Sequence, residues 1–118
     1  NPHHYCMPVV KNENDLISLR KAACFNNSKF FLGTDSAPHH VDHKKQNKTL
    51  KAGIFSSSNS IELYALIFEE ENALENLELF SSINGPKFYN MDVNKHYLTL
   101  KKELISKFLM KVVVVIIY

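Results

Sequence analysis

The feature that most constrains the fold is the order of the apolar segments in the first third of the chain. Residues 4–7 read as a short strand that ends at Pro8, and residues 29–32 (KFFL) read as a buried strand that ends at Gly33. A helical pattern separates the two predicted strands. Strand, helix and strand within about 30 residues are typical of the βαβ unit, which builds a parallel sheet or a (β/α) barrel. The sequence therefore predicts an α/β protein.

The helical pattern between these strands places Leu16, Leu19 and Ala23 on one face. Asn12 or Asn14 is available to cap its start, and an Asn pair at 26–27 is expected to end it. Further along, residues 61–70 and 73–79 have helical spacing, 84–86 (NGP) reads as a turn, and 97–100 alternates weakly, as in a strand. The acidic residues of the second half read as a solvated helix face: Glu69, Glu70, Glu71, Glu75 and Glu78.

Composition narrows the class of protein. The 118 residues fit one ordinary domain and are too few for a complete barrel enzyme, which needs about 250 residues. A net charge of +2, and a Lys-rich loop without interleaved aromatics, disfavour nucleic acid as a partner. The C-terminal apolar run has seven residues, too few to span a membrane, and reads as a buried strand or a sticky tail. Two cysteines, Cys6 and Cys24, and no visible signal peptide lead us to expect a soluble cytoplasmic protein.

Candidate chemistry is concentrated in residues 30–40, FFLGTDSAPHH. The apolar strand delivers Asp35 to its C-terminal end, where ligands and reacting groups collect in parallel α/β folds. Such an aspartate can bind a metal, transfer a proton or cap the following helix, and the residues alone leave these alternatives open. His39 follows a proline that stiffens the loop, but its side chain could be merely solvated. A metal cluster of His39, His40 and His43 is disfavoured. His3 and His4 are expected to serve packing.

Four motifs, in order, resemble the shorter, stand-alone class of dihydroorotases. LGTDSAPH (32–39) resembles the last barrel strand of that family, and PHHYCMP (2–8) its penultimate strand. FEEENALENLELF (68–80) and SINGPKFY with the following VN (82–94) resemble its C-terminal helices and the turn after them. The resemblance implies that the chain is the C-terminal part of a TIM (β/α)8 barrel of the metal-dependent amidohydrolase type, comprising the last two strands and the closing helices.

The resemblance also implies a reaction and a site. Dihydroorotases interconvert dihydroorotate and carbamoyl-aspartate in pyrimidine synthesis, with two zinc ions bridged by hydroxide and a carboxylated lysine. Asp35 matches the residue that binds one metal and acts as the general acid and base. His39 matches the histidine that binds the substrate carboxylate, and Met7 and Ala52 match positions whose backbone contacts the substrate.

The sequence also departs from the family pattern. The loop 40–51 lacks the usual Cys- and Gly-rich sequence, and the tail 103–118 (ending VVVVIIY) is diverged. The family's H-x-H, its carboxylated lysine, two further metal-binding histidines and a substrate-binding arginine and asparagine all precede this region. We therefore expect residues 1–118 to form one incomplete domain that binds zinc poorly, lacks activity and dissolves poorly on its own.

Three readings of function are compatible with these observations. The first is a dihydroorotase, and because dimers are common in that family, a homodimer is one expectation for the complete enzyme. The second is another cyclic amidohydrolase of the dihydropyrimidinase or allantoinase type. The third is a non-catalytic, dihydroorotase-like interaction protein.

Overall fold

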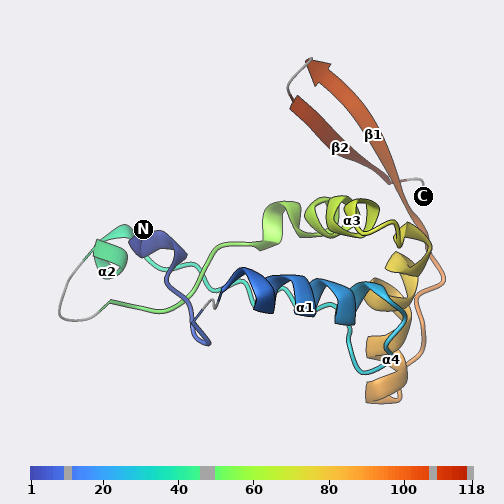
Figure 1. Cartoon of the computed structure of the whole chain (residues 1–118), viewed down its shortest axis with the longest axis horizontal. Coiled ribbons are helices and arrows are strands. Elements are labelled where there is room, and N and C mark those ends of the chain that lie inside the picture. The colour runs from blue at the N-terminus through green and yellow to red at the C-terminus, as the bar shows by residue number, and fades with distance from the viewer. Residues whose placement is uncertain (10–11, 46–49, 107–108, 117–118) are drawn as a thin grey trace. The chain divides into compact units, whose positions relative to one another are not determined.

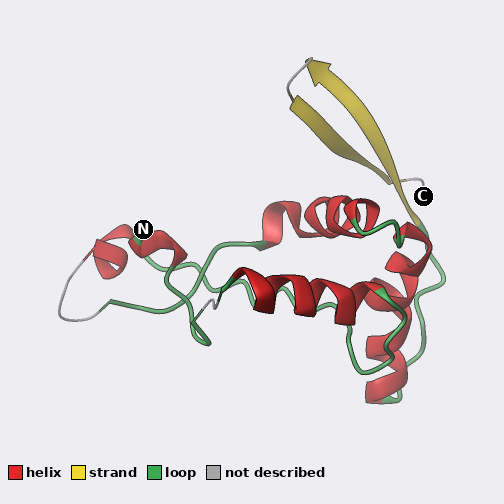
Figure 2. Ribbon diagram, in the orientation of Figure 1, coloured by secondary structure: helices red, strands yellow, loops and turns green. Residues whose placement is uncertain are grey.

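Helices make up most of the regular secondary structure in this protein. Its structure, a computed structural model, describes residues 1–9, 12–45, 50–106 and 109–116. Within these ranges, four α-helices precede a hairpin of two strands (Figures 1 and 2). The helices are α1 (Glu13–Cys24), α2 (Val41–Lys45), α3 (Ser60–Glu70) and α4 (Asn84–Tyr89), and the strands are β1 (Leu98–Ser106) and β2 (Leu109–Ile116). Shorter 3-10 turns lie at Pro2–His4, Ser57–Asn59 and Leu74–Asn76, and a π-helical turn lies at Leu79–Ile83.

The chain divides into two compact units. Unit 1 comprises residues 1–19 and 33–60, and unit 2 comprises residues 20–32 and 61–118. All four predicted site residues (Met7, Asp35, His39 and Ala52) belong to unit 1. The apolar core belongs to unit 2.

The predicted barrel strands at 4–7 and 29–32 are wrong for this structure, because neither segment joins a β-ladder among the described residues. Other partners occupy their backbone groups. The Leu32 amide donates to the Phe80 carbonyl at 3.0 Å, and the Asn84 side-chain amide donates to the Phe30 carbonyl at 3.1 Å. A strand is defined by its neighbours, so an apolar segment without an adjacent strand satisfies its polar groups elsewhere. The described residues accordingly form no barrel.

Helix α1 begins as its sequence predicts. The Asn12 side chain accepts from the Asp15 amide at 3.1 Å, and the Asp15 carboxylate accepts from the Asn12 amide at 3.2 Å. This reciprocal pair is a capping box, which satisfies two amides that lack helical partners. The helix ends at Cys24, and Asn26 follows in the left-handed conformation (φ 53°), as the Asn pair indicates.

The apolar face predicted for α1 is only partly packed. Ala23 packs against the core of unit 2, whereas Leu16 and Leu19, which the pattern places on the same face, are exposed. The core consists of Cys24, Phe68, Ala73 and Phe80, with the Phe80 ring 5.3 Å from the ring of Phe68. Burial raises the pKa of the Cys24 thiol, because an apolar environment disfavours the thiolate.

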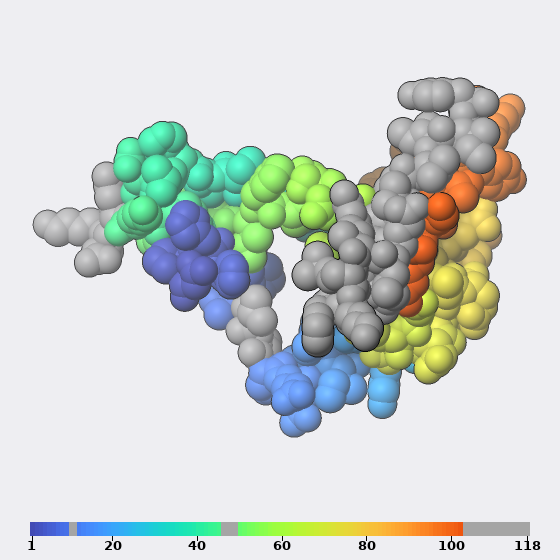
Figure 3. All heavy atoms as spheres, turned by 90° about the horizontal axis from the view of Figure 1, so that it is seen from above, coloured from blue at the N-terminus to red at the C-terminus, as the bar shows by residue number. Residues whose placement is uncertain are grey.

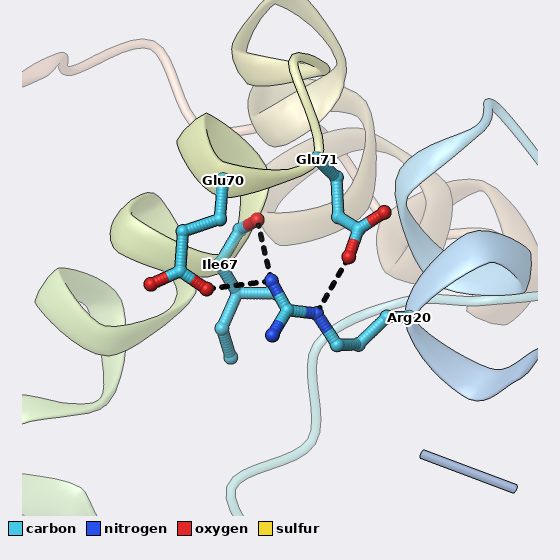
Figure 4. A network of polar contacts seen from close by, with 4 residues as sticks. All are labelled: Arg20, Ile67, Glu70 and Glu71. Atoms are coloured by element: carbon cyan, nitrogen blue, oxygen red, sulfur yellow. Dashed lines mark hydrogen bonds and ion pairs between the residues drawn. The ribbon is translucent and has the colours of Figure 1, made fainter. Parts of the chain in front are cut away.

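One arginine links the end of α1 to the end of α3 within unit 2. The Arg20 guanidinium lies 2.7 Å from Glu70 through Nη2 and 2.8 Å from Glu71 through Nε (Figure 4). Nη2 also donates to the Ile67 carbonyl at 3.5 Å. The hydrogen bond to Glu70 raises the pKa of Arg20, which therefore stays charged. Three of the five acidic residues predicted as a solvated face are therefore ion-paired. Glu70 and Glu71 pair with Arg20, and Glu69 pairs with Lys102.

Helical structure continues from 74 to 89, so the turn predicted at 84–86 is wrong. Residues 84–86 form the first turn of α4, directly after the π-helical turn, and the Asn84 amide donates to the Leu79 carbonyl. The segment turns only after Tyr89, at Asn90 in the left-handed conformation. The helices predicted at 61–70 and 73–79 are present, the second as a 3-10 turn that leads into helix.

The C-terminal part of the described chain is an antiparallel hairpin. Strand β1 pairs with β2 from Leu98 opposite Ile116 to Ser106 opposite Leu109, with an irregularity near Leu104. The strand predicted at 97–100 is therefore the start of a longer one, and most of the apolar tail forms its partner. No helix among the described residues is long and apolar enough to cross a membrane.

Candidate active site

Three extended segments of unit 1 are joined by backbone hydrogen bonds. The Gly53 amide donates to the Tyr5 carbonyl at 2.9 Å, and the Ala37 amide donates to the Ile54 carbonyl at 2.9 Å. Segment 52–54 is therefore bonded on one side to the segment that carries Met7 and on the other to the segment that carries Asp35 and His39. Residues 5, 37 and 53 are far apart in the sequence, but these hydrogen bonds bring their segments together. The three segments carry all four predicted site residues.

His39 and Ala52 are brought into direct contact. The His39 Nε2 atom lies 3.0 Å from the Ala52 carbonyl oxygen. A carbonyl oxygen only accepts, so this geometry assigns the hydrogen to Nε2, and Nδ1 becomes a second donor when the ring is protonated. The resemblance assigns substrate contacts to both residues, which are 13 positions apart in the sequence.

Asp35 has a left-handed backbone conformation, with φ 43°, and an exposed side chain. Its two neighbours are fixed by Ser56, whose hydroxyl donates to the Thr34 carbonyl at 2.9 Å and whose amide donates to the Ser36 hydroxyl at 3.2 Å. Aspartate is among the residues that tolerate this conformation best. Asp35 caps no helix, because the next helix, α2, starts only at Val41. The carboxylate is presented to solvent on an anchored loop.

The structure does not place Met7 and Asp35 against the other two predicted residues. Met7 is 65% exposed and precedes a cis peptide bond to Pro8. A cavity of about 270 Å³ nearby includes His39 but not Met7, Asp35 or Ala52 in its wall, which is made by His3, His4, Pro38, His39, Lys44, Gly53, Ile54 and Phe55. His3 and His4 are exposed and line this cavity, so the packing role predicted for them is wrong.

Lys44 is a residue that the sequence does not single out, because it lies in a Lys-rich loop. Lys44 is 3% exposed, and its ammonium donates to the carbonyls of Tyr5 (3.0 Å), Lys51 (3.0 Å) and Gly53 (2.8 Å). In the space-filling view, the dark blue start of the chain lies against the teal residues around α2, which carries Lys44 (Figure 3). Nothing in the pattern KKQNK distinguishes this lysine from its neighbours.

Within the described ranges, no group of three or more His, Cys, Asp or Glu side chains is arranged to hold a metal ion. His40 Nδ1 lies 3.1 Å from the Asp42 carboxylate, and the His40 and His43 rings are 6.4 Å apart, but no third ligand joins them. Asp35 is the one predicted metal ligand, and a zinc site requires about four. The described residues therefore do not by themselves fit a two-zinc centre.

Comparisons with known proteins agree on one group of enzymes. No family model matches the chain, but curated proteins do. The dihydroorotase of Aliivibrio fischeri (strain MJ11) is 52% identical over 102 residues, and that of Erythrobacter litoralis (strain HTCC2594) is 48% identical over 101 residues. Each match covers 86% of this chain, which spans about 30% of the first relative and 29% of the second.

Two solved structures give the same result for the backbone. Dihydroorotase from Saccharomyces cerevisiae, solved in complex with 5-fluoroorotic acid, matches 78% of this chain and 25% of its own length, with a TM-score of 0.75 and 46% identity. Dihydroorotase from Campylobacter jejuni matches 87% of this chain and 29% of its own length, with a TM-score of 0.71 and 32% identity.

These matches define the class of the chain as the C-terminal portion of an amidohydrolase of the TIM-barrel type. Within that class, its sequence and backbone match the C-terminal portion of dihydroorotases.

Proposed function

We propose that this chain supplies the C-terminal part of a dihydroorotase active site, which hydrolyses the cyclic amide of dihydroorotate to carbamoyl-aspartate and catalyses the reverse reaction. The observation that carries the proposal is the match, at 46% identity and a TM-score of 0.75, to a dihydroorotase. The chain spans less than a third of its relatives, so the proposed activity requires residues beyond the ones it matches.

In the proposed reaction, water adds to the ring carbonyl carbon, the C–N bond breaks, the carbonyl carbon becomes a carboxylate and the nitrogen leaves as an amide. One proton of the water must be transferred to the departing nitrogen, and the second is released to solvent as the carboxylate forms. We assign the removal of the first proton from the water, and its delivery to the nitrogen, to the Asp35 carboxylate, which is exposed on the Ser56-anchored loop. General acid–base catalysis of this kind contributes about 10²–10⁴ in rate.

Substrate binding is assigned to the segments that the hydrogen bonds of unit 1 hold together. A protonated His39 is the proposed partner of the substrate carboxylate, with the ring oriented by its contact to the Ala52 carbonyl. The backbone at Met7 and Ala52 is proposed to contact the ring. Zinc, which the resemblance implies, would polarise the ring carbonyl and activate water, but its ligands would come almost entirely from outside the described residues.

We propose that the protein is cytoplasmic and acts on a small-molecule substrate. A homodimer and the absence of nucleic-acid partners remain part of the proposal. We further propose that residues 1–118 constitute one incomplete amidohydrolase domain, with 103–118 as its diverged tail.

The test is a chimera in which this chain replaces the matching C-terminal portion of the Aliivibrio fischeri dihydroorotase. The controls are the intact relative and the relative truncated before the junction, with circular dichroism to verify folding. We expect the chimera to consume dihydroorotate and the truncated relative to be inactive. Asp35→Asn retains the shape and the left-handed backbone but removes the charge, and it should lower kcat by about 10²–10⁴ with a small change in KM.

The proposal fails if a folded chimera turns over no more dihydroorotate than the truncated relative. The purified 118-residue chain is expected to show no turnover, and measurable activity of that chain would contradict the assignment of the missing ligands to other residues.

A further inference from the structure

The buried side chain of Lys44 is the most unusual feature of unit 1. Among the described residues of this unit, it is the only one that is buried, and every buried apolar side chain lies in unit 2. An ammonium group has three N–H donors, and here each one meets a backbone carbonyl at 2.8–3.0 Å. Unit 1 is therefore organised around a cation with all its hydrogen bonds satisfied.

The three carbonyls belong to the two backbone segments that matter for substrate. Lys51 and Gly53 flank Ala52 on either side, so the ammonium holds the peptide groups before and after that residue. Tyr5 lies two residues before Met7, and its carbonyl also accepts the Gly53 amide at 2.9 Å. Lys44 thus fixes the spacing between the segment of Met7 and the segment of Ala52.

The shape of the group suits this task. Three carbonyl oxygens that converge on one point repel one another unless a positive charge lies between them. A lysine ammonium is a compact charge with tetrahedral donors, whereas the planar guanidinium of arginine cannot direct three N–H groups to one such point. The Tyr5 ring, whose centroid is 5.9 Å from Nζ, adds a favourable cation–π contact.

We propose that Lys44 is a positioning residue for substrate binding, which acts through the backbone at 5–7 and 51–53 and through the Ala52 carbonyl that orients His39. This inference rests on the proposed function. In the described part of the chain, no hydrogen bond or ion pair joins Lys44 to Asp35, so we assign Lys44 a role in substrate affinity and not in the proton transfers. Its ammonium has no donor left for the substrate, which separates it from a direct anion-binding lysine.

The test uses the chimera with Lys44→Met, which retains the length of the side chain and removes the three donors. The matched control is Lys45→Met, an exposed neighbour on the same helix. We expect Lys44→Met to raise KM for dihydroorotate about tenfold while kcat stays within about twofold, and Lys45→Met to change neither. Lys44→Arg retains the charge but not the geometry, and it should raise KM as well.

Hydrogen–deuterium exchange supplies a readout that is independent of activity. Lys44→Met should accelerate exchange at 51–54 and leave the helices of unit 2 protected. If Lys44→Met does not fold, Lys44→Gln, which retains two donors, carries the same test with a smaller rise in KM. An unchanged KM, an equal fall in kcat, full function of Lys44→Arg, or an equal effect of Lys45→Met would each overturn the positioning role. An inactive unsubstituted chimera would instead overturn the proposed function.

Discussion

Gly53 allows the sharpest quantitative prediction, because its environment has no room for a side chain. Its φ of +147° lies in a region that residues with a Cβ rarely adopt. A Cβ built at this position would lie 2.4 Å from the Ala37 carbonyl oxygen, 2.8 Å from the Ala37 Cβ and 3.0 Å from His39 Nε2. The two shortest contacts involve the backbone and the Cβ of a neighbouring segment, so rotation of a flexible side chain cannot relieve them.

The cost of Gly53→Ala has two parts. A residue forced into such a backbone conformation costs about 1–3 kcal/mol, and a methyl group inserted without space costs about 1–3 kcal/mol. Relaxation offsets part of this, and we expect a net loss of about 3 kcal/mol. The shift needed to relieve the clash separates segment 52–54 from segment 37–39, so the contact of His39 with Ala52 should be lost along with stability.

The assay compares Gly53→Ala with Gly33→Ala in the chimera. A Cβ at Gly33 meets nothing within 4 Å, so that substitution should be neutral or stabilise by about 0.4–1 kcal/mol through the unfolded chain. We expect Gly53→Ala to lower Tm by several degrees and to raise KM, and Gly33→Ala to do neither. Equal Tm and KM values for the two variants would refute the reasoning that the close approach of the three segments builds the site.

Further predictions concern unit 2. Phe68→Ala should destabilise the chimera by about 3–5 kcal/mol in urea unfolding, because Phe68 is fully buried. Leu63→Ala, on the exposed side of the same helix, should lower the free energy of unfolding much less. Similar losses for the two variants would contradict the assigned core. In the native protein, iodoacetamide should modify the partly exposed Cys6 well before the buried Cys24, and equal rates would contradict the packing. Because the folded-state pKa of Cys24 is raised, its contribution to stability is complete below the ordinary thiol pKa near 9.0 and is lost as pH rises above it. Cys24→Ala should remove that alkaline decline in Tm.

Local signals in the sequence predict the helices well. The caps of α1 follow from Asn12, Asp15 and the Asn pair after Cys24, since a capping side chain needs only the backbone a few residues away. The spacing in α3 is similarly local. The strands at 4–7 and 29–32 fail for the opposite reason. An apolar segment becomes a strand only beside another strand, and the partners of Tyr5 and Leu32 are Gly53 and Phe80, which lie 48 residues away in each case.

The residues of the candidate site differ in the same way: some are recognisable from the local sequence, and others only from contacts with distant segments. Asp35 and His39 are identifiable because they follow an apolar segment within a recognisable motif, although their roles remain proposals. Lys44 is not identifiable, because its burial depends on three carbonyls from two other segments. Gly53 had a weak signal, since a glycine next to a predicted backbone contact suggests a close approach, but only the structure shows that Ala37 and His39 occupy the space.

The different construction of the two units has a functional consequence. Unit 2 is stabilised by buried apolar side chains, whose contribution is distributed over many contacts, so single polar substitutions at its surface should be tolerated. Among its described residues, unit 1 buries only Lys44, and its segments are joined by a few hydrogen bonds. Regions with few buried apolar contacts open at low free energy. Under the proposed function, a substrate bound across segments 5–7, 37–39 and 51–53 would therefore have to order them. Residues such as Lys44 and Gly53, which order these segments before binding, should for this reason affect KM more strongly than kcat.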